Sequence, residues 1–187
     1  MWQDWHLRRA ARVVGRGGVI AYPTEAVWGL GCNPWNPAAV ARILDLKGRP
    51  ASKGLIVIAA TFAQLSPYVV FPSPEVRAQV VATWPGPVTW ILPVTPGVPA
   101  WLRGGRGSLA VRVTAHPVAA ALCRLAGPLV STSANPAGRS PARSVLAVHR
   151  YFGARIDYRV PGATGSRSRP TEIRDARTGL VLRHGSS

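Results

Sequence analysis

The chain has 187 residues and a 47% apolar composition, which exclude a disordered protein and suit one domain with a substantial core. Its two cysteines exclude a disulfide framework and a cysteine-rich zinc site. The formal net charge of +16 indicates attraction to polyanions, and only two of the 23 cations, Lys47 and Lys53, are lysines.

Neither a membrane span nor a signal peptide is predicted. The longest near-apolar run, residues 54–65, is too short to cross a bilayer. Residues 1–14 carry charge where a signal peptide has an apolar core. We therefore expect a cytoplasmic protein in a reducing compartment, with no membrane partner.

The first half of the chain alternates predicted helices and strands. Residues 4–16 have the apolar spacing of a helix capped by its first residue, and residues 18–22 form a short buried strand. A second helix begins where Asn36 precedes a proline and ends at Gly48. The uninterrupted apolar run at residues 55–59 predicts a strand that is buried on both faces.

The second half continues this alternation. Leu109, Val111 and Val113 occupy alternate positions in residues 108–114, which predicts a strand with one apolar face. The other predicted elements are a helix at 74–83, strands at 88–94 and 128–131, a helix at 116–126, a polar turn at 132–140, a helix at 141–152, a weak strand near Tyr158 and a last strand at 179–183. This pattern, without linker or repeat, predicts one α/β domain over residues 1–187, with a mixed, twisted sheet.

Two polar residues, Thr24 and Glu25, lie just after the first predicted strand, separated from it by Pro23. Open α/β sheets bind ligands at the carboxyl ends of their strands, so the pair is a candidate for ligand contact. Spacing alone favours a simpler interpretation, in which Thr24 caps a following helical turn.

Three cations, Lys47, Arg49 and Lys53, fall within seven residues at a predicted helix end. They can complement the helix macrodipole or lie on a solvated surface. However, the cluster leads directly into the buried strand at 55–59, which places it at the edge of the sheet. Since Arg contacts two phosphate oxygens at once and Lys is a mobile point charge, we favour a role in binding a phosphate chain.

Arg112 shares one strand face with Ser108, Ala110 and Thr114. Burying an unpaired guanidinium in an apolar strand is too costly, so either this face is exposed or Arg112 meets an anion in a cleft. At roughly 3.3 Å per residue, Ser108 and Arg112 lie about 13 Å apart, which suits two ends of one ligand.

Small polar side chains gather near the end of the strand at 128–131. Ser131, Thr132, Ser133 and Asn135 supply hydroxyls and an amide, and a turn here exposes backbone N–H groups. Such donors suit phosphate oxygens. Taken alone, an ordinary Asx or Ser turn before a proline explains these residues better.

Six segments occur in an order and at spacings that are similar to a known family. They are YPTEAVWGLGC (22–32), LKGRPASKGLIVIAA (46–60), WPGPVTW (84–90), SLAVRVTAHP (108–117), LVSTSANPAG (129–138) and PTEIRDARTG (170–179). Each is weak alone, but together they resemble the YrdC family of threonylcarbamoyl-AMP synthases over essentially the whole chain.

The resemblance implies a YrdC-like α/β fold, with a twisted, mixed open sheet flanked by helices and a large basic central cavity. It implies that L-threonine, bicarbonate (or CO2) and ATP give L-threonylcarbamoyladenylate and pyrophosphate. That reaction is the first step toward N6-threonylcarbamoyladenosine at position 37 of tRNAs that read ANN codons. TsaB/TsaD/TsaE-type proteins would be transient partners, and Mg²⁺ would be carried on phosphates, because seven scattered carboxylates do not predict a protein-built cage.

By position, the resemblance also assigns roles to residues of this sequence. The catalytic set is Lys47, Arg49, Ser133 and Asn135. The ATP-binding set adds Lys53, Arg143, Thr171 and Arg183 to these four, and the threonine and bicarbonate set is Thr24, Ser108 and Arg112. Longer members of the family have a threonine residue at the position of Ala26. This chain therefore lacks that hydroxyl near the expected binding site of the L-threonine substrate.

A non-catalytic module that binds double-stranded RNA or tRNA is the alternative. The charge of +16 favours it, since arginines can read the shape of an RNA duplex through phosphates and 2'-hydroxyls without any cleft. Such a module does not need a Ser-x-Asn turn or two isolated lysines, so the motifs favour the enzyme. Both interpretations hold if the outer surface contacts tRNA.

Overall fold

The computed structural model describes residues 2–167 and 171–184. Its helices are α1 (Trp2–Gly15), α2 (Pro37–Lys47), α3 (Pro74–Val81), α4 (Ala100–Arg103), α5 (Pro117–Ala126) and α6 (Val145–Phe152), with a short 3-10 turn, η1 (Ala51–Lys53), after α2. Its strands are β1 (Ile20–Pro23), β2 (Trp28–Gly31), β3 (Ile56–Ala59), β4 (Val88–Pro93), β5 (Ser108–Val113), β6 (Leu129–Ser133), β7 (Tyr158–Arg159), β8 (Glu172–Asp175) and β9 (Val181–Arg183). Within these ranges, no helix combines the length and the apolar character needed to cross a membrane.

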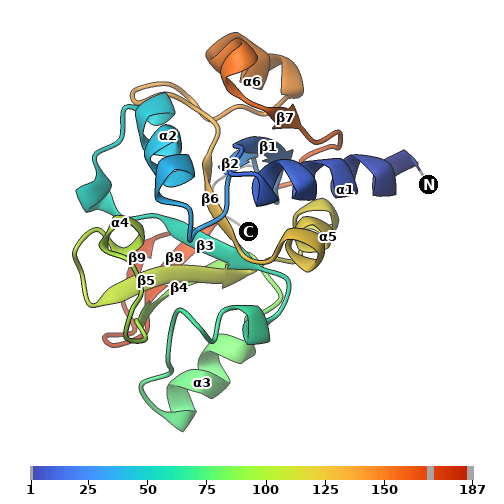
Figure 1. The fold of residues 1–187 in the computed structure, drawn as a ribbon. Coiled ribbons are helices and arrows are strands. Elements are labelled where there is room, and N and C mark those ends of the chain that lie inside the picture. Colours follow the sequence, from blue (N-terminus) through green and yellow to red (C-terminus); the bar gives the residue numbers. More distant parts are fainter. Residues whose placement is uncertain (1, 168–170, 185–187) are drawn as a thin grey trace.

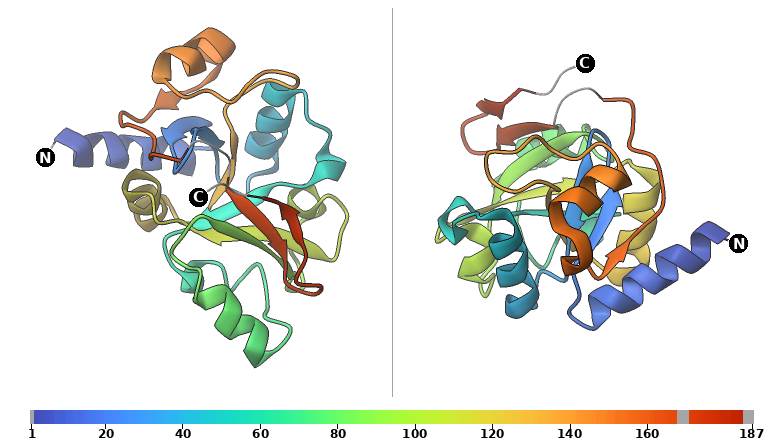
Figure 2. Two further views of the ribbon diagram at one scale, coloured as in Figure 1. Left: turned by 180° about the vertical axis from the view of Figure 1, so that it is seen from behind. Right: turned by 90° about the horizontal axis from the view of Figure 1, so that it is seen from above.

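The strands build one mixed sheet, as predicted. In the described part of the chain its order is β7-β1-β2-β6-β3-β5-β4-β8-β9. The pairs β1–β7, β3–β5 and β4–β8 are parallel, and the other neighbours are antiparallel. Helices surround this sheet, with α3 at one end of the molecule and α6 at the other (Figures 1 and 2).

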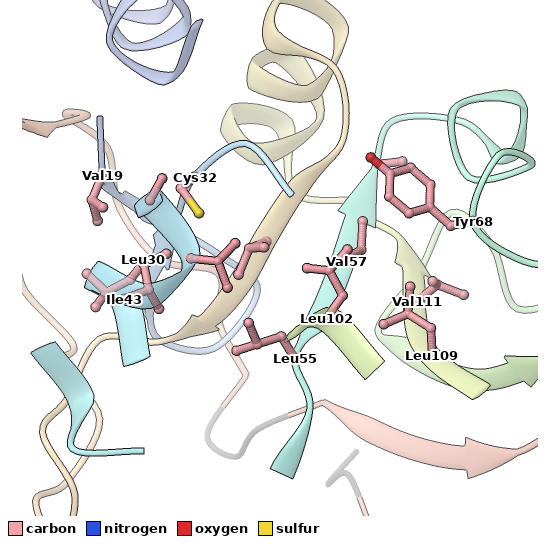
Figure 3. Packing of buried hydrophobic residues seen from close by; sticks show 14 of the residues in the cluster. Val19, Leu30, Cys32, Ile43, Leu55, Val57, Tyr68, Leu102, Leu109 and Val111 are labelled. Atoms are coloured by element: carbon pink, nitrogen blue, oxygen red, sulfur yellow. The ribbon is translucent and has the colours of Figure 1, made fainter. Parts of the chain in front are cut away.

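The helices cover two apolar clusters on opposite faces of the sheet. On one face, α2 packs Ile43 into a cluster that includes Ala21 and Val57. On the other face, α1 and α5 cover a cluster that includes Ile20 and Ile58. Successive strand residues point to opposite faces, so β1 and β3 contribute to both clusters. Figure 3 shows residues of the first cluster, among them Ile43 of α2, Val57 of β3 and Val111 of β5.

The predicted boundaries of the second helix are confirmed. Asn36 Oδ1 accepts the backbone N–H of Ala39 at 3.0 Å, and Gly48 ends α2 with a φ of 59°, in the left-handed region that favours glycine. The strand predicted at 55–59 is confirmed as β3, which pairs with β5 on one side and β6 on the other. Local signals therefore locate the last residue of α2, Lys47, and the strand that follows it.

Asn36→Ala should lower the free energy of unfolding by about 1 kcal/mol, because the first turn of α2 would lose its side-chain cap. Urea denaturation followed by circular dichroism would measure this as a lower midpoint with an unchanged slope. Asn36→Asp keeps an accepting oxygen and is the matched control, with a smaller expected loss. Equal midpoints for the alanine variant and the wild type would contradict this expectation.

Several predicted boundaries are wrong by two or more residues: besides β1, α3 and β9, which begin or end two residues from the predicted position, three others are explained by local contacts. α1 begins at Trp2, so Asp4 lies within its first turn and pairs with Arg8 instead of capping the helix. α6 begins at Val145 and not at 141, because Ser144 provides the cap. β6 extends to Ser133, so the start of the predicted polar turn is strand that pairs with β2.

Strands β2 and β8 are absent from the sequence prediction. β2 is rich in glycine, and a Cβ at Gly31 would lie only 2.8 Å from the carbonyl oxygen of Val130 and from a ring carbon of Tyr22. Glycine therefore permits close packing in a strand here, although its sequence resembles a turn. β8 is a short strand that lies between β4 and β9 in the sheet. The sequence predicts both of these neighbours but not β8 itself.

Candidate active site

A pocket of about 300 Å³ lies on one face of the sheet. Ser108, Ala110 and Arg112 of β5 and Ser131 and Ser133 of β6 line it, at alternate positions of their strands. Farther along the same face, α1 and α5 cover apolar residues of β3 and β6. The pocket is thus the part of this face where polar residues lie beside apolar ones, such as Ile56 and Ile91.

Most of the expected site residues meet at this pocket. Its lining includes Thr24, Arg49, Lys53, Ser108, Arg112, Ser133, Thr171 and Arg183. Arg103 and Arg106, which the sequence prediction left out of the site, bring the lining cations to six, and no Asp or Glu is among the described residues of the lining. The pocket therefore concentrates positive charge on the scale of a small polyanion.

Arg112 is buried, at 5% exposure, which excludes the exposed strand face, one of the two alternatives that the sequence left open. Its Nη2 lies 3.2 Å from Glu25 Oε2 in an ion pair, and its Nη1 donates to Thr171 Oγ1 at 2.7 Å. The anion that Arg112 meets is thus a carboxylate of its own chain. The sequence contained one signal for this partner, since a guanidinium at an apolar strand position needs an anion.

Glu25 stays ionised in this buried position. Burial alone would raise its pKa, but the charge of Arg112, the hydrogen bond that Thr114 Oγ1 donates at 2.6 Å and the nearby His116 together bring the pKa below its ordinary value. Glu25 and Arg112 therefore form a buried pair of full charges beside the pocket.

Arg183 reaches the pocket from β9 and is held by Thr171. Its Nε and Nη2 donate to the carbonyl oxygen of Thr171 at 2.9 and 2.6 Å. Burial, and next the charge of Arg112, lower the pKa of Arg183. An anion between these two guanidinium groups would relieve their repulsion.

The segment between α2 and β3 folds back on itself around Arg49. Arg49 Nη2 donates to the carbonyl oxygen of Gly54 at 3.0 Å, and η1 carries Lys53 beside it. Gly104, with a φ of 63°, packs so closely that a Cβ would lie 2.5 Å from the carbonyl oxygen of Ser52. Burial, followed by the charge of Arg106, lowers the pKa of Arg49.

Lys47 anchors the turn that follows β6. It is 6% exposed, and its Nζ donates to the carbonyl oxygens of Ser133 and Asn135, the latter at 2.9 Å, and to Asn135 Oδ1 at 3.4 Å. Burial, and next the charge of Arg49, lower its pKa to about 8. Lys47 lines a second pocket of about 220 Å³, which shares Arg49, Lys53 and Ser133 with the first.

The Ser-x-Asn turn is held by more hydrogen bonds than an isolated Asx turn would have. Asn135 Nδ2 donates to the carbonyl oxygens of Pro136 at 3.1 Å and Arg139 at 2.7 Å. The side chain of Asn135 thus closes the turn, while Lys47 holds it from the other side. The predicted Lys-x-Arg and Ser-x-Asn pairs are therefore in direct contact.

The surroundings of two expected site residues, Thr24 and Arg143, differ from the prediction. Thr24 Oγ1 donates to the carbonyl oxygen of Val27 at 2.7 Å and closes the β1–β2 hairpin, so the expected helical turn is wrong, although Thr24 lines the pocket. Ala26 lies next to it in the lining. Arg143 is exposed, precedes α6 and is not among the residues that line either pocket.

Comparison with known proteins identifies the family. The model of the Sua5/YciO/YrdC family, described as "Telomere recombination", matches residues 12–185. The chain is 59% identical over 181 residues to the threonylcarbamoyl-AMP synthase of Nitrosococcus oceani, covering 96% of this chain and 98% of that one. It is 60% identical over 183 residues to the enzyme of the same name from Halorhodospira halophila, covering 97% and 95%. The chain belongs to the Sua5/YciO/YrdC family.

Solved structures agree with this assignment. The crystal structure of P. abyssi Sua5 complexed with L-threonine superposes with a TM-score of 0.92 at 34% identity, covering 97% of this chain and 54% of that one. E. coli YciO superposes with a TM-score of 0.84 at 28% identity, covering 99% and 91%. The chain thus spans about half of P. abyssi Sua5 but nearly the whole of its bacterial relatives.

Proposed function

We propose that the protein is a threonylcarbamoyl-AMP synthase, which converts L-threonine, bicarbonate (or CO2) and ATP into L-threonylcarbamoyladenylate and pyrophosphate. The observation that carries the proposal is the convergence of eight expected residues on one pocket lined by six cations and several hydroxyls. The name of relatives at 59% and 60% identity supports it. Residues 1–187 would act as a single domain.

The chemistry suits the side chains that are present. The threonine amine would take up CO2, or bicarbonate with loss of water, to form a carbamate. A carbamate oxygen would attack the α-phosphorus of ATP, and pyrophosphate would leave with the electrons of the broken P–O bond. This step depends on positioning and on neutralising charge more than on a proton carrier.

Two groups of residues would divide the substrates between them. Thr24, Ser108 and Arg112 would hold the carboxylate or carbamate of threonine. Lys47, Arg49, Lys53, Ser133, Asn135, Thr171 and Arg183 would bind ATP, and Lys47, Arg49, Ser133 and Asn135 would stabilise the charge that develops on the phosphates. Arg143, outside both linings, stays a prediction of the resemblance.

A divalent cation would arrive with the nucleotide. Among residues 2–167 and 171–184, no three or more His, Cys, Asp or Glu side chains group in a way that could hold a metal ion. The described pocket linings also lack carboxylates. Mg²⁺ would therefore be coordinated by phosphate oxygens, whose charge it would partly neutralise.

The partners of this activity would be those of tRNA modification in the cytoplasm. TsaB/TsaD/TsaE-type proteins would take the threonylcarbamoyl group to adenosine 37. α1 would be the surface for tRNA: Arg8, Arg9 and Arg12 are exposed on it, and Arg9 lies 5.2 Å from the ring centroid of exposed Trp5. Binding of duplex RNA without turnover would instead support the non-catalytic alternative.

The deciding experiment incubates the purified protein with ATP, labelled bicarbonate and L-threonine. Pyrophosphate release that requires both threonine and bicarbonate, with label incorporated into an adenylate, is the expected result. No turnover, together with tight binding of duplex RNA, would overturn the proposal.

Asn135→Ala should reduce kcat/KM by about 10- to 100-fold, because the turn that presents Ser133 loses its closing hydrogen bonds. Steady-state kinetics of pyrophosphate release would measure this loss. Asn33→Ala is the control, since Asn33 also precedes a proline and makes a local hydrogen bond, in which its Oδ1 accepts the backbone N–H of Trp35, but it lies outside both linings. Equal losses in the two variants would contradict a specific role for the Ser-x-Asn turn.

A further inference from the structure

Glu25 contacts Arg112 but not the pocket. Its side chain is buried, at 8% exposure, and Glu25 is absent from the described lining of either pocket, whereas Arg112 lines the first. A substrate in the pocket would therefore meet Arg112 and not the carboxylate. The hydrogen bond and ion pair with Arg112 connect the Glu25 carboxylate to the pocket lining.

The carboxylate of Glu25 has a fixed position. Oε1 accepts from Thr114 Oγ1 at 2.6 Å, and Oε2 accepts from Arg112 Nη2 at 3.2 Å. The backbone is held as well, since the N–H of Gly165 donates to the carbonyl oxygen of Thr24 at 2.9 Å. A Cβ at Gly165 would lie 2.5 Å from the carbonyl oxygen of Glu25, so the loop packs directly on this residue.

The orientation of Arg112 depends on this carboxylate. Glu25 holds Nη2, and Thr171 at 2.7 Å and Thr89 at 3.5 Å accept from Nη1. The buried Nε has no hydrogen-bond partner among the described residues. Because the guanidinium is a planar, rigid fork, contacts at both terminal nitrogens fix the plane of the whole group. Glu25 supplies the one charged contact among them.

We propose that Glu25 is a positioning residue of the active site, which holds the guanidinium of Arg112 in the orientation that binds the carboxylate or carbamate of the threonine-derived substrate. The identity of that ligand rests on the proposed function, whereas the orientation of Arg112 does not. The other five lining cations would repel a guanidinium that was free to move, so the carboxylate also keeps Arg112 among them.

Glu25→Gln tests the proposal, because it keeps the size of the side chain and an acceptor for Thr114 but removes the charge. We expect kcat/KM for L-threonine to fall by about 10- to 100-fold, mainly through a higher KM, while the KM for ATP stays close to the wild-type value. Glu172→Gln is the matched control, because Glu172 pairs with Arg174 outside the pocket lining. A lower kcat with both KM values unchanged would indicate only a smaller folded fraction and would overturn the proposal.

Two further variants separate positioning from folding. Glu25→Asp keeps the charge but withdraws the carboxylate by one methylene, and it should also raise the KM for threonine. In an Arg112→Lys background, Glu25→Gln should have little additional effect, because the group through which it acts is gone. A wild-type KM for threonine in Glu25→Asp would overturn the proposal. So would a double variant in which Glu25→Gln reduces kcat/KM by the same factor as it does in the wild-type background.

The position of Arg112 can also be measured without activity. The ¹H–¹⁵N resonance of its Nε–H, assigned by its loss in Arg112→Lys, should shift in Glu25→Gln but not in Glu172→Gln. An unshifted resonance would overturn the positioning role. A shifted resonance in a protein whose wild type forms no adenylate would refute the proposed function and leave the positioning role standing.

Discussion

Pyrophosphate formation should fall above about pH 8, as Lys47 loses its proton. Burial, and next the charge of Arg49, lower the pKa of Lys47 from 10.5 to about 8. The neutral amine has only two N–H groups, so it cannot donate to all three oxygens that it holds at residues 133 and 135. The kcat/KM for ATP, which reports the free enzyme, should decline about tenfold per pH unit above this pKa.

Variants at the two lysines test whether the titration of Lys47 causes this decline in activity. Lys47→Arg remains charged, so the decline above pH 8 should disappear, whereas Lys53→Arg should keep it. Lys47→Ala should lose about 10³-fold in kcat/KM at pH 7, because both the charge and the anchor of the turn are removed. A decline that persists unchanged in Lys47→Arg would show that another group titrates.

The same titration affects stability in the opposite direction. Because the pKa in the folded protein, about 8, lies below the ordinary 10.5, the unfolded chain binds this proton more tightly. The contribution of Lys47 to the free energy of unfolding therefore rises as the pH increases from about 8 to 10.5. Circular dichroism at each pH would confirm that the folded fraction is constant where activity falls.

What could be predicted from the sequence depends on local signals. Asn36 and Gly48 delimit α2 through contacts within a few residues, so the positions of Lys47 and Arg49 at its end follow from the sequence. The apolar run of β3 identifies a buried strand next to them. The part of the site that carries Lys47, Arg49 and Lys53 is local in this sense, because one helix end and the turn after it build it.

The other half of the site depends on contacts between distant segments. Arg112 and Glu25 are 87 residues apart, and spacing shows only that Arg112 needs an anion, not which one. Gly31 belongs to a strand because it packs against Tyr22 and Val130, and this tertiary contact overrides the turn-like composition of β2. Thr171 likewise reaches Arg112 only because β8 pairs with β4.

Arg112→Met should lower the free energy of unfolding by about 3–5 kcal/mol at pH 7, because it leaves the carboxylate of Glu25 buried without its cation. The hydrogen bond from Thr114 remains, but it does not supply the opposite charge. Urea denaturation at several pH values would measure the loss. The adjacent pocket surface would also lose the cation that we assign to the threonine substrate.

The pH dependence of this loss identifies its cause. In the wild type the pKa of Glu25 lies below 4.5, so its contribution to stability is present above pH 4.5 and is lost as the pH falls through the lower folded value. In Arg112→Met, burial is no longer offset by the guanidinium and raises this pKa above 4.5. The deficit should therefore be full at pH 7 and shrink as the pH falls toward 4.5.

Two comparisons separate the buried charge from the loss of packing. Glu25→Gln/Arg112→Met contains no buried charge at this place, so it should recover most of the stability that Arg112→Met loses. Arg8→Met breaks the exposed ion pair with Asp4 on α1, whose side chains are 63% and 56% exposed, and should leave the urea midpoint unchanged. If the double variant is no more stable than Arg112→Met, lost packing around the guanidinium, and not an unpaired carboxylate, would account for the deficit.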